Sequence, residues 1–448
     1  MEPPRGEPSA AGIATGGGVV RACRVDDVSL RAFLCTHTRP RLAWADATTT
    51  IAAGGAAATL TAEGETRFRD IREQADQLFA GLDSPDSVPT GARPRVFGGF
   101  SFTASRGDNR LNGRWEGYPD AEFVLPAVQF SVTADGAWVT ATAVGPDAHE
   151  RATTRLRDWR DRSAALPELA VSGPPGVNAR EYTPKQERWR ADVESVTGRI
   201  RKGELRKVVL AQALRTELDG TPVLPDMLAR LGESYPGCHR FLFEPANGGA
   251  FFGATPERLV SVSGDTVDTE ALAGSTGRGE TTAEDEWLAS QLADSAKDNH
   301  EHDLVVEAIR NQLSPLVEEI ETGTRTVRQL ATVQHLRTPV RAKLTQDRHV
   351  LELVEALHPT PAVGGMPPGA ALETIQEAEA FDRGWYAAPV GWFDRDGDGT
   401  FAVAIRSAIA RETTATLFAG AGIVADSDAD EEWDELQLKY RPVLDELA

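Results

Sequence analysis

The order of strand-like and helix-like segments constrains the fold of this chain more than any other feature. Short apolar runs broken by Gly, Pro and Asp turns, such as Arg95–Phe102 and Phe123–Val132, fill residues 19–170. Apolar residues then recur at helical spacing over Trp189–Lys202 and Leu304–Ile320, with short strands between and after these helices. Because strands and helices do not alternate regularly, the pattern favours an α+β fold over a parallel sheet.

Composition divides the chain into three regions. Residues 1–18, rich in Pro, Gly, Ala and Ser, lack the apolar segment of a signal peptide, so we expect a disordered tail. A strand-rich N-terminal region covers residues 19–175 and ends in a Gly-Pro linker at Ser172–Val177. After this linker, helix-like stretches appear, and we expect strands at Lys207–Leu214, Arg240–Phe243, Leu259–Val262, Phe401–Arg406 and Ala415–Ala419.

Charge and cysteine content exclude several classes of protein. The chain has 68 acidic and 47 basic residues, a net charge of −21, which argues against nucleic acid or an anionic membrane as a partner. No window approaches about 18 uninterrupted apolar residues, as a membrane-spanning helix requires. Cys23, Cys35 and Cys238 are too widely spaced for a zinc site or a disulfide framework. We therefore expect a soluble cytoplasmic protein, and the scarcity of lysine beside many carboxylates suggests adaptation to high salt.

Lys207 is a charged side chain at the start of an apolar, β-branched strand. Lysine occurs elsewhere only at positions 185, 202, 297, 343 and 439. Position alone leaves two interpretations open: the ammonium group extends to solvent from the strand end, or the amine lies in a pocket as a general base.

Two helix-like segments carry carboxylates on one face. Asp298 and Glu301 are three residues apart, and Glu432, Glu435 and Lys439 also share a face. Because Mg²⁺ binds a few carboxylates and keeps positions for water and substrate oxygens, these segments could form a magnesium site. The alternative is a pair of solvated acidic helices.

Small residues border three turns, at Gly253–Glu257, Leu272–Ser275 and Gly420–Ile423. Backbone N–H groups in such turns can approach a ligand closely, and Glu257 places a carboxylate in one of them. Arg406 is expected to end an apolar strand, where a guanidinium could bind a substrate carboxylate. Hairpin turns and a salt bridge at the rim are the structural alternative.

An ordered set of motifs resembles the chorismate-utilising enzymes of menaquinone, siderophore and tryptophan synthesis. The set reads KVVLAQ, GATPE, LAGS, SAKDNHEH, QHLRT, HPTPAVGG, FDRGWYAAPVGW, AIR, GAGIV and EEWDELQLK. It spans about residues 182–443, and the N-terminal part is similar more loosely, through Phe97–Phe102 and Trp115. The resemblance implies the aminodeoxychorismate synthase fold: two large antiparallel sheets packed together with helices outside, as one integrated unit.

Within that family the chain most resembles the isochorismate synthases. These enzymes isomerise chorismate by adding water at C2 and expelling the C4 hydroxyl, with Mg²⁺ as cofactor. The resemblance implies Lys207 as the base, Glu257 as the acid, and magnesium held by Glu301 and Glu435 with support from Glu432 and Asp298. The residues that it implies for substrate binding are Arg406, Lys439 and Gly422 at the enolpyruvyl carboxylate, and Ala273, Gly274, Ser275, His335, Ala362 and Val363 around the ring.

Two positions favour isochorismate as the product. The ammonia-using anthranilate and aminodeoxychorismate synthases typically have glutamine where Lys207 stands, so we expect no glutaminase subunit. Salicylate synthases share the lysine, but commonly have T-A-S-G at Pro361–Gly364 and threonine at Ser275. Both classes, and a catalytically silent chorismate-binding protein, remain alternatives, and the product could serve menaquinone, siderophore or salicylate synthesis.

Overall fold

The computed structural model describes residues 17–26, 28–84, 88–104, 113–163, 166, 170–331 and 333–448. Residues 1–16 of the predicted tail lie outside the described residues, and Gly18, which closes that tail, is the first residue of a strand. Within the described ranges, no helix is long and apolar enough to cross a membrane.

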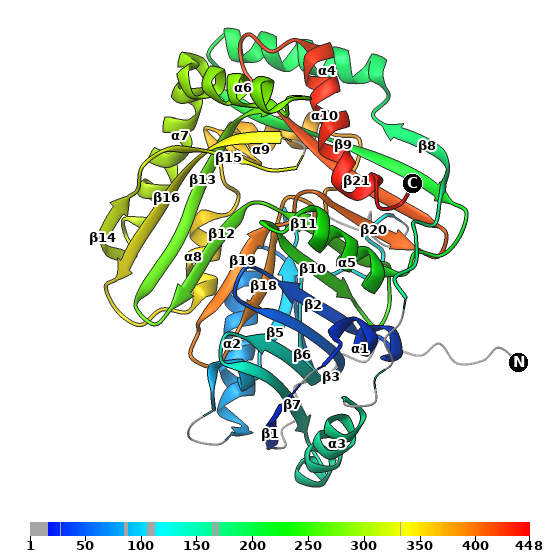
Figure 1. The fold of residues 1–448 in the computed structure, drawn as a ribbon. Coiled ribbons are helices and arrows are strands. Elements are labelled where there is room, and N and C mark those ends of the chain that lie inside the picture. The colour runs from blue at the N-terminus through cyan, green and yellow to red at the C-terminus, as the bar shows by residue number, and fades with distance from the viewer. Residues whose placement is uncertain are drawn as a thin grey trace, which may run out of the picture.

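The strands form two antiparallel sheets that meet at one long strand, β6 (Figure 1). The first sheet runs in the order β8, β9, β21, β20, β11, β10, β2, β3, β6, β7, β1 and β4. Only the short β1–β4 pairing is parallel among the described strands. The bounds are β8 Val177–Thr183, β9 Lys207–Leu218, β21 Thr414–Ile423, β20 Ser407–Arg411, β11 Ala250–Thr255, β10 His239–Glu244, β2 Arg41–Ala45, β3 Thr50–Ala62, β6 Ala121–Thr133, β7 Gly136–Val144, β1 Gly18–Val25 and β4 Leu82–Asp83.

The second sheet continues from the N-terminal half of β6 through β5, β18, β19, β12, β13 and β16. Strands β14 and β15 both pair with β16, and the short β17 pairs with β9. The bounds are β5 Val96–Phe100, β18 Pro389–Phe393, β19 Gly399–Val403, β12 Arg258–Ser263, β13 Thr266–Gly277, β16 Val333–Leu344, β14 Val317–Thr322, β15 Thr326–Gln329 and β17 Gly365–Met366. The predicted fold class is therefore confirmed, with the two sheets hydrogen-bonded into one network.

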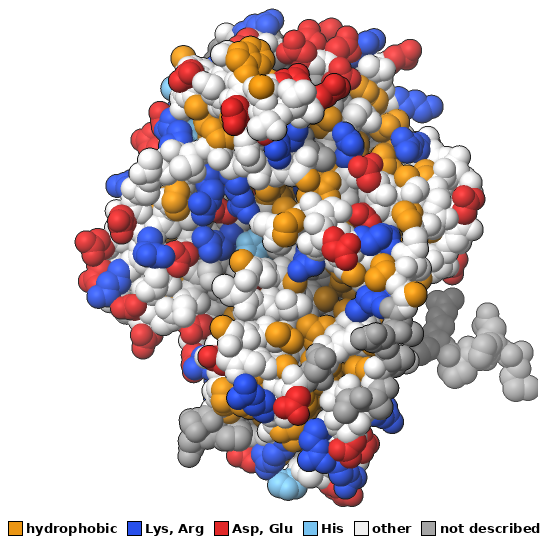
Figure 2. Space-filling view, viewed as in Figure 1, with side chains coloured by type: hydrophobic (Ala, Val, Ile, Leu, Met, Phe, Trp, Pro, Cys, Tyr) orange, Lys and Arg blue, Asp and Glu red, His pale blue; other side chains and the backbone are white. Residues whose placement is uncertain are grey.

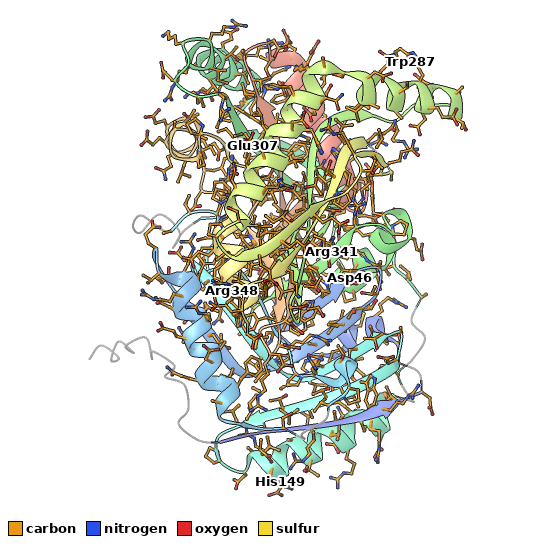
Figure 3. The ribbon with its side chains drawn as sticks, turned by 90° about the vertical axis from the view of Figure 1, so that its left-hand side faces the viewer. Asp46, His149, Trp287, Glu307, Arg341 and Arg348 are labelled. Atoms are coloured by element: carbon orange, nitrogen blue, oxygen red, sulfur yellow. The ribbon has the colours of Figure 1, made fainter. Side chains whose placement is uncertain are left out.

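Helices lie outside the sheets, and acidic side chains gather at the end of the molecule that carries α4 and α10 (Figures 1 and 2). Helix α7 packs against β13, α9 against β9, and α10 against β21. Helices α3 and α6 lie at opposite ends, as the labelled His149 and Trp287 show (Figure 3). The bounds are α1 Leu30–Thr36, α2 Arg67–Ala80, α3 Ala148–Ser163, α4 Gln186–Arg201, α5 Leu224–Ser234, α6 Thr282–Asp294, α7 Ala296–Leu313, α8 Val350–Leu357, α9 Pro368–Ala378 and α10 Ala429–Leu444, with a 3₁₀ turn at Thr90–Ala92.

Aromatic side chains fill the space between the two sheets. The Trp385 ring lies 4.9 Å from the Phe243 ring of β10, measured between centroids. On the other side, a Cβ added to Gly99 of β5 would lie 2.8 Å from Trp385. Truncating such a buried tryptophan to alanine costs about 3–5 kcal/mol. One hydrophobic cluster contains residues from both sides of the predicted linker, which supports an integrated fold.

Two element predictions were wrong at their boundaries. The helix expected to reach Ile320 ends at Leu313, because Pro315 has no N–H to continue it, and the chain enters β14 instead. The strand expected to end at Arg406 stops at Val403. Arg406 lies in the connection to β20 with a φ of 52°.

The N-terminal region was predicted as strand-rich, but it also contains α1, α2 and α3. In α2 the buried residues Phe68, Ile71, Ala75 and Leu78 recur at helical spacing. The helical signal was therefore present in the sequence, between runs that are strands.

Candidate active site

One cavity of about 360 Å³ contains every residue assigned to catalysis, substrate binding or metal binding from the motifs. It lies between the ends of β9, β13, β16 and β21 and the first turns of α7 and α10. The assigned residues that line it are Lys207, Glu257, Ala273, Gly274, Ser275, Asp298, Glu301, His335, Ala362, Val363, Arg406, Gly422, Glu432, Glu435 and Lys439.

Lys207 begins β9 and is buried, with 7% of the residue exposed. Its Nζ donates a hydrogen bond to Oε1 of Glu301 at 2.6 Å, so the side chain does not extend to solvent and that interpretation is wrong. A Cβ added to Gly422 would lie 3.0 Å from Cε of Lys207. Because such a contact is tighter than ordinary packing allows, glycine at 422 leaves room for the lysine.

Glu257 follows β11 and is buried. The backbone N–H of Glu257 donates a hydrogen bond to the Thr255 hydroxyl at 3.2 Å, and this hydroxyl donates to the Val403 carbonyl at 2.7 Å. These two hydrogen bonds fix the turn. Burial, followed by the charge of Glu270, raises the pKa of Glu257 to about 7 against the opposing effect of nearby cations. A substantial fraction of this carboxyl therefore carries a proton near neutral pH.

The first two turns of α7 place the carboxylates of Asp298 and Glu301 in the cavity. Ser295 caps the helix, its Oγ accepting from the Asp298 N–H at 3.2 Å. His302 turns the other way, and its Nε2 lies 2.7 Å from Oγ1 of Thr338 on β16. Gly274 occupies a bulge in β13 with a φ of 75°, and a Cβ there would lie 3.1 Å from Cβ of Asp298. This glycine lets α7 approach the sheet closely.

Helix α10 contributes a second lysine–carboxylate pair. Nζ of Lys439 lies 2.7 Å from Oε1 of Glu435 and also donates to the Gly420 carbonyl at 2.7 Å. Burial would raise the pKa of Glu435, but the charge of the adjacent Lys439 and its hydrogen bond lower it below the usual value. Burial and the charge of Glu435 raise the pKa of Glu432 to about 7. Oε2 of Glu432 is buried, and none of the residues that the structure describes forms a hydrogen bond with it.

Neutral and cationic groups form the opposite wall. Nδ1 of His335 lies 2.8 Å from Oγ of Ser275, and burial lowers the pKa of His335 to about 3, so its ring is neutral. Arg406 is buried, which lowers its pKa. Among the described residues, no carboxylate lies within 4.0 Å of its guanidinium. A buried cation without a carboxylate partner suits an anionic substrate.

Arg383 lines the cavity and was not singled out, although the FDRGWY motif contains it. Between β17 and β8, no described strand lies beside the edge of β9, and the Glu379–Arg383 ion pair takes that place. Nη2 of Arg383 donates to the Val209 carbonyl at 2.7 Å, and Oε1 of Glu379 accepts from the Ala211 N–H at 2.8 Å. Nη1 donates to the Val363 carbonyl at 2.8 Å. This pair therefore fixes the strand that carries Lys207.

Lys297 and Tyr386 also line the cavity and were not singled out. Nζ of Lys297 lies 3.6 Å from Oδ2 of Asp426. Burial raises the pKa of Tyr386 to about 12, so its phenol is a hydrogen-bond donor to the cavity. In the part of the chain that the structure describes, no three His, Cys, Asp or Glu side chains are close enough to hold a metal ion by themselves.

Comparison with known proteins agrees with this site. The family model described as "Chorismate binding enzyme" matches residues 20–448. A protein named salicylate biosynthesis isochorismate synthase, from Pseudomonas aeruginosa, is 37% identical over 91% of this chain and 85% of its own length. Isochorismate synthase MenF of Bacillus subtilis is 34% identical over 85% of this chain and 81% of its own.

Solved structures agree as well. The menaquinone-specific isochorismate synthase MenF of Escherichia coli superposes with a TM-score of 0.81 at 25% identity, covering 97% of this chain and 96% of that one. Anthranilate synthase component I of Streptococcus pneumoniae, at 22% identity and a TM-score of 0.72, shares the fold. The family model, the curated relatives and the superposition together show that the chain belongs to the chorismate binding enzyme family.

Proposed function

We propose that this enzyme is an isochorismate synthase, which converts chorismate to isochorismate. The observation that carries the proposal is the pairing of a buried amine, Lys207, with a buried carboxyl, Glu257, whose pKa lies at about 7, in one cavity. Water addition with loss of a hydroxyl needs such a base and such an acid. The relatives named as isochorismate synthases support the same conclusion.

The reaction forms one C–O bond and breaks another. Water attacks C2 of chorismate, the ring double bonds shift, and the C4–O bond breaks. Lys207 accepts the proton that the attacking water loses, and Glu257 donates a proton to the departing hydroxyl, which leaves as water. Nζ of Lys207 donates to Oε1 of Glu301 at 2.6 Å, so the role as base requires this pair to open when substrate binds.

The two carboxylates of chorismate need separate partners. Arg406, Lys439 and the backbone near Gly422 would bind the enolpyruvyl carboxylate, which is supported by their place in the cavity and by the lack of a carboxylate partner of Arg406 among the described residues. Ala273, Gly274, Ser275 and neutral His335 would line the ring, together with Ala362 and Val363.

The carboxylates of α7 and α10 fit a magnesium ion. Mg²⁺ needs only one or two protein carboxylates when water and substrate oxygens complete its shell. The buried, unpartnered Oε2 of Glu432 is an acceptor that such a cation would satisfy. Glu301 and Glu435 would hold the ion, with Glu432 and Asp298 in support, and the bound ion would neutralise the ring carboxylate of the substrate.

The proposal also covers the partners, the location and the product of the enzyme. Water is the nucleophile, so the enzyme needs no glutaminase subunit, and neither nucleic acid nor membrane is a partner. The three cysteines are free thiols, which supports a reducing compartment, and we place the enzyme in the cytoplasm. The product would enter menaquinone or siderophore and salicylate synthesis.

Chorismate turnover with products separated by chromatography tests the proposal. With Mg²⁺ present, isochorismate should be the product. Salicylate with pyruvate would identify a salicylate synthase, anthranilate formed with ammonium would identify an ammonia-using enzyme, and no turnover would indicate a silent binding protein.

A further inference from the structure

We propose that Glu270, Arg328 and Arg337 form a positioning cluster: the two arginines hold Glu270 against the Pro256–Glu257 turn, and the Glu270 carboxylate keeps the Glu257 carboxyl protonated for catalysis. The inference rests on the proposed function, because that function makes Glu257 the acid. None of the three residues of the cluster lines the catalytic cavity.

One guanidinium links the cluster to the catalytic turn. Glu270 on β13 has a side chain only 4% exposed, and its two oxygens contact different arginines. Nη1 of Arg328, on β15, lies 3.1 Å from Oε1, and Nε of Arg337, on β16, lies 2.5 Å from Oε2. The same Nη1 donates to the carbonyl of Pro256 at 2.9 Å, immediately before Glu257. The position of the acid is therefore coupled to that of Glu270.

The charges around Glu257 oppose one another. Three cations favour its ionised form, whereas burial and one carboxylate favour the protonated form. If that carboxylate lost its charge, burial alone would oppose the cations, and Glu257 would release its proton at lower pH. The groups that act on it from the surrounding elements are Glu270 of β13, Arg406 before β20, Lys207 of β9, Lys439 of α10 and the Tyr386 phenol.

The other side of the cluster faces a second cavity of about 560 Å³, which Arg328, Arg337 and Glu270 help to line. Figure 2 shows Lys and Arg side chains gathered over the β13, β15 and β16 part of this face. Because 33% of the Arg337 side chain is exposed, this arginine can be replaced without opening the core. The cluster thus stands between a solvent-facing cavity and the catalytic one.

Two substitutions with opposite expected effects test the proposal. The measurement is the pH profile of kcat/KM for isochorismate formation. The fall in kcat/KM at high pH, the basic limb of this profile, reports loss of the Glu257 proton. Glu270→Gln should move this limb to lower pH, so that activity above the limb falls about tenfold for each unit moved while the low-pH plateau is retained. Arg337→Gln leaves the Arg328 contacts in place and removes a counter-charge of Glu270, so the limb should move to higher pH.

A matched control comes from the same strand. Asp268 lies two residues before Glu270 on β13 and forms the equivalent pair with β16, its Oδ1 lying 3.0 Å from Nε of Arg341 (labelled in Figure 3). This pair is more exposed and does not contact the catalytic turn. Asp268→Asn should leave the limb and the plateau unchanged.

An unmoved limb with a uniform loss of activity in Glu270→Gln would overturn the proposal, because it would indicate a merely structural role. If Glu270→Gln does not fold, an unmoved limb in Arg337→Gln overturns it equally. Failure of the proposed function is recognised separately: the unmodified enzyme would then form no isochorismate, or Glu257→Gln would retain full activity.

Discussion

Replacing Lys207 by glutamine removes the proposed base but keeps a hydrogen-bond donor toward Glu301. A positioned general base contributes about 10²–10⁴-fold to a rate, so we expect kcat to fall by that factor. KM should change little, because Lys207 is not assigned to either substrate carboxylate. The loss of rate should therefore lie almost wholly in the chemical step.

The structure also sets the expected effect on stability. Nζ of Lys207 and Oε1 of Glu301 lie 2.6 Å apart, with side chains 8% and 21% exposed. A hydrogen bond to a charged group contributes about 1.5–3 kcal/mol, and the glutamine amide recovers part of it. The net loss of about 1–2 kcal/mol lowers Tm by only a few degrees in a chain of this size.

Steady-state kinetics, with isochorismate quantified by chromatography, measures the effect on kcat and KM. Thermal unfolding followed by circular dichroism measures the effect on Tm. Lys439→Gln is the matched control, because Lys439 forms the other lysine–carboxylate pair, with Glu435 at 2.7 Å. It should raise KM more than it lowers kcat. A folded Lys207→Gln enzyme that keeps more than about a tenth of the original kcat would refute the assignment of the base.

Further predictions concern the lysine pocket, the metal and the solvent. Gly422→Ala should lower kcat about tenfold or more, because the new methyl group would lie 3.0 Å from Cε of Lys207. Gly369→Ala is the control: a Cβ added there meets no atom within 4 Å, so this change should be neutral in the same assay. Glu301→Gln and Glu435→Gln should each weaken Mg²⁺ binding in calorimetric titration, and unchanged affinity would count against them as ligands. With a net charge of −21, the protein should unfold at lower temperature in salt-free buffer than in molar KCl, and indifference to salt would contradict salt adaptation.

Local patterns predicted the elements that carry the site. The apolar run after Lys207 is β9, and Glu432, Glu435 and Lys439, expected on one face of a helix, do line the same cavity. These predictions worked because side-chain period and helix spacing are local properties of the sequence. The turn that holds Arg406 was misjudged, because a positive φ of 52° at a residue other than glycine has no signal in the local sequence.

The supporting contacts could not be predicted in the same way. Glu379 and Arg383 replace a missing strand beside β9, and Arg328 reaches Pro256 across 72 positions of the sequence. Such contacts depend on which strands become neighbours, and no local pattern contains that information. Only the family motifs indicated that residues so far apart share one cavity.

The central claim is that water adds to C2 while the C4 hydroxyl leaves, and turnover in ¹⁸O-labelled water tests it most directly. Purified enzyme, chorismate and Mg²⁺ in H₂¹⁸O should yield isochorismate with one ¹⁸O atom, located by mass spectrometry in the C2 hydroxyl. Isochorismate without the label would show that the hydroxyl migrates within the substrate. That result would contradict the assignment of Lys207 as the base that activates water.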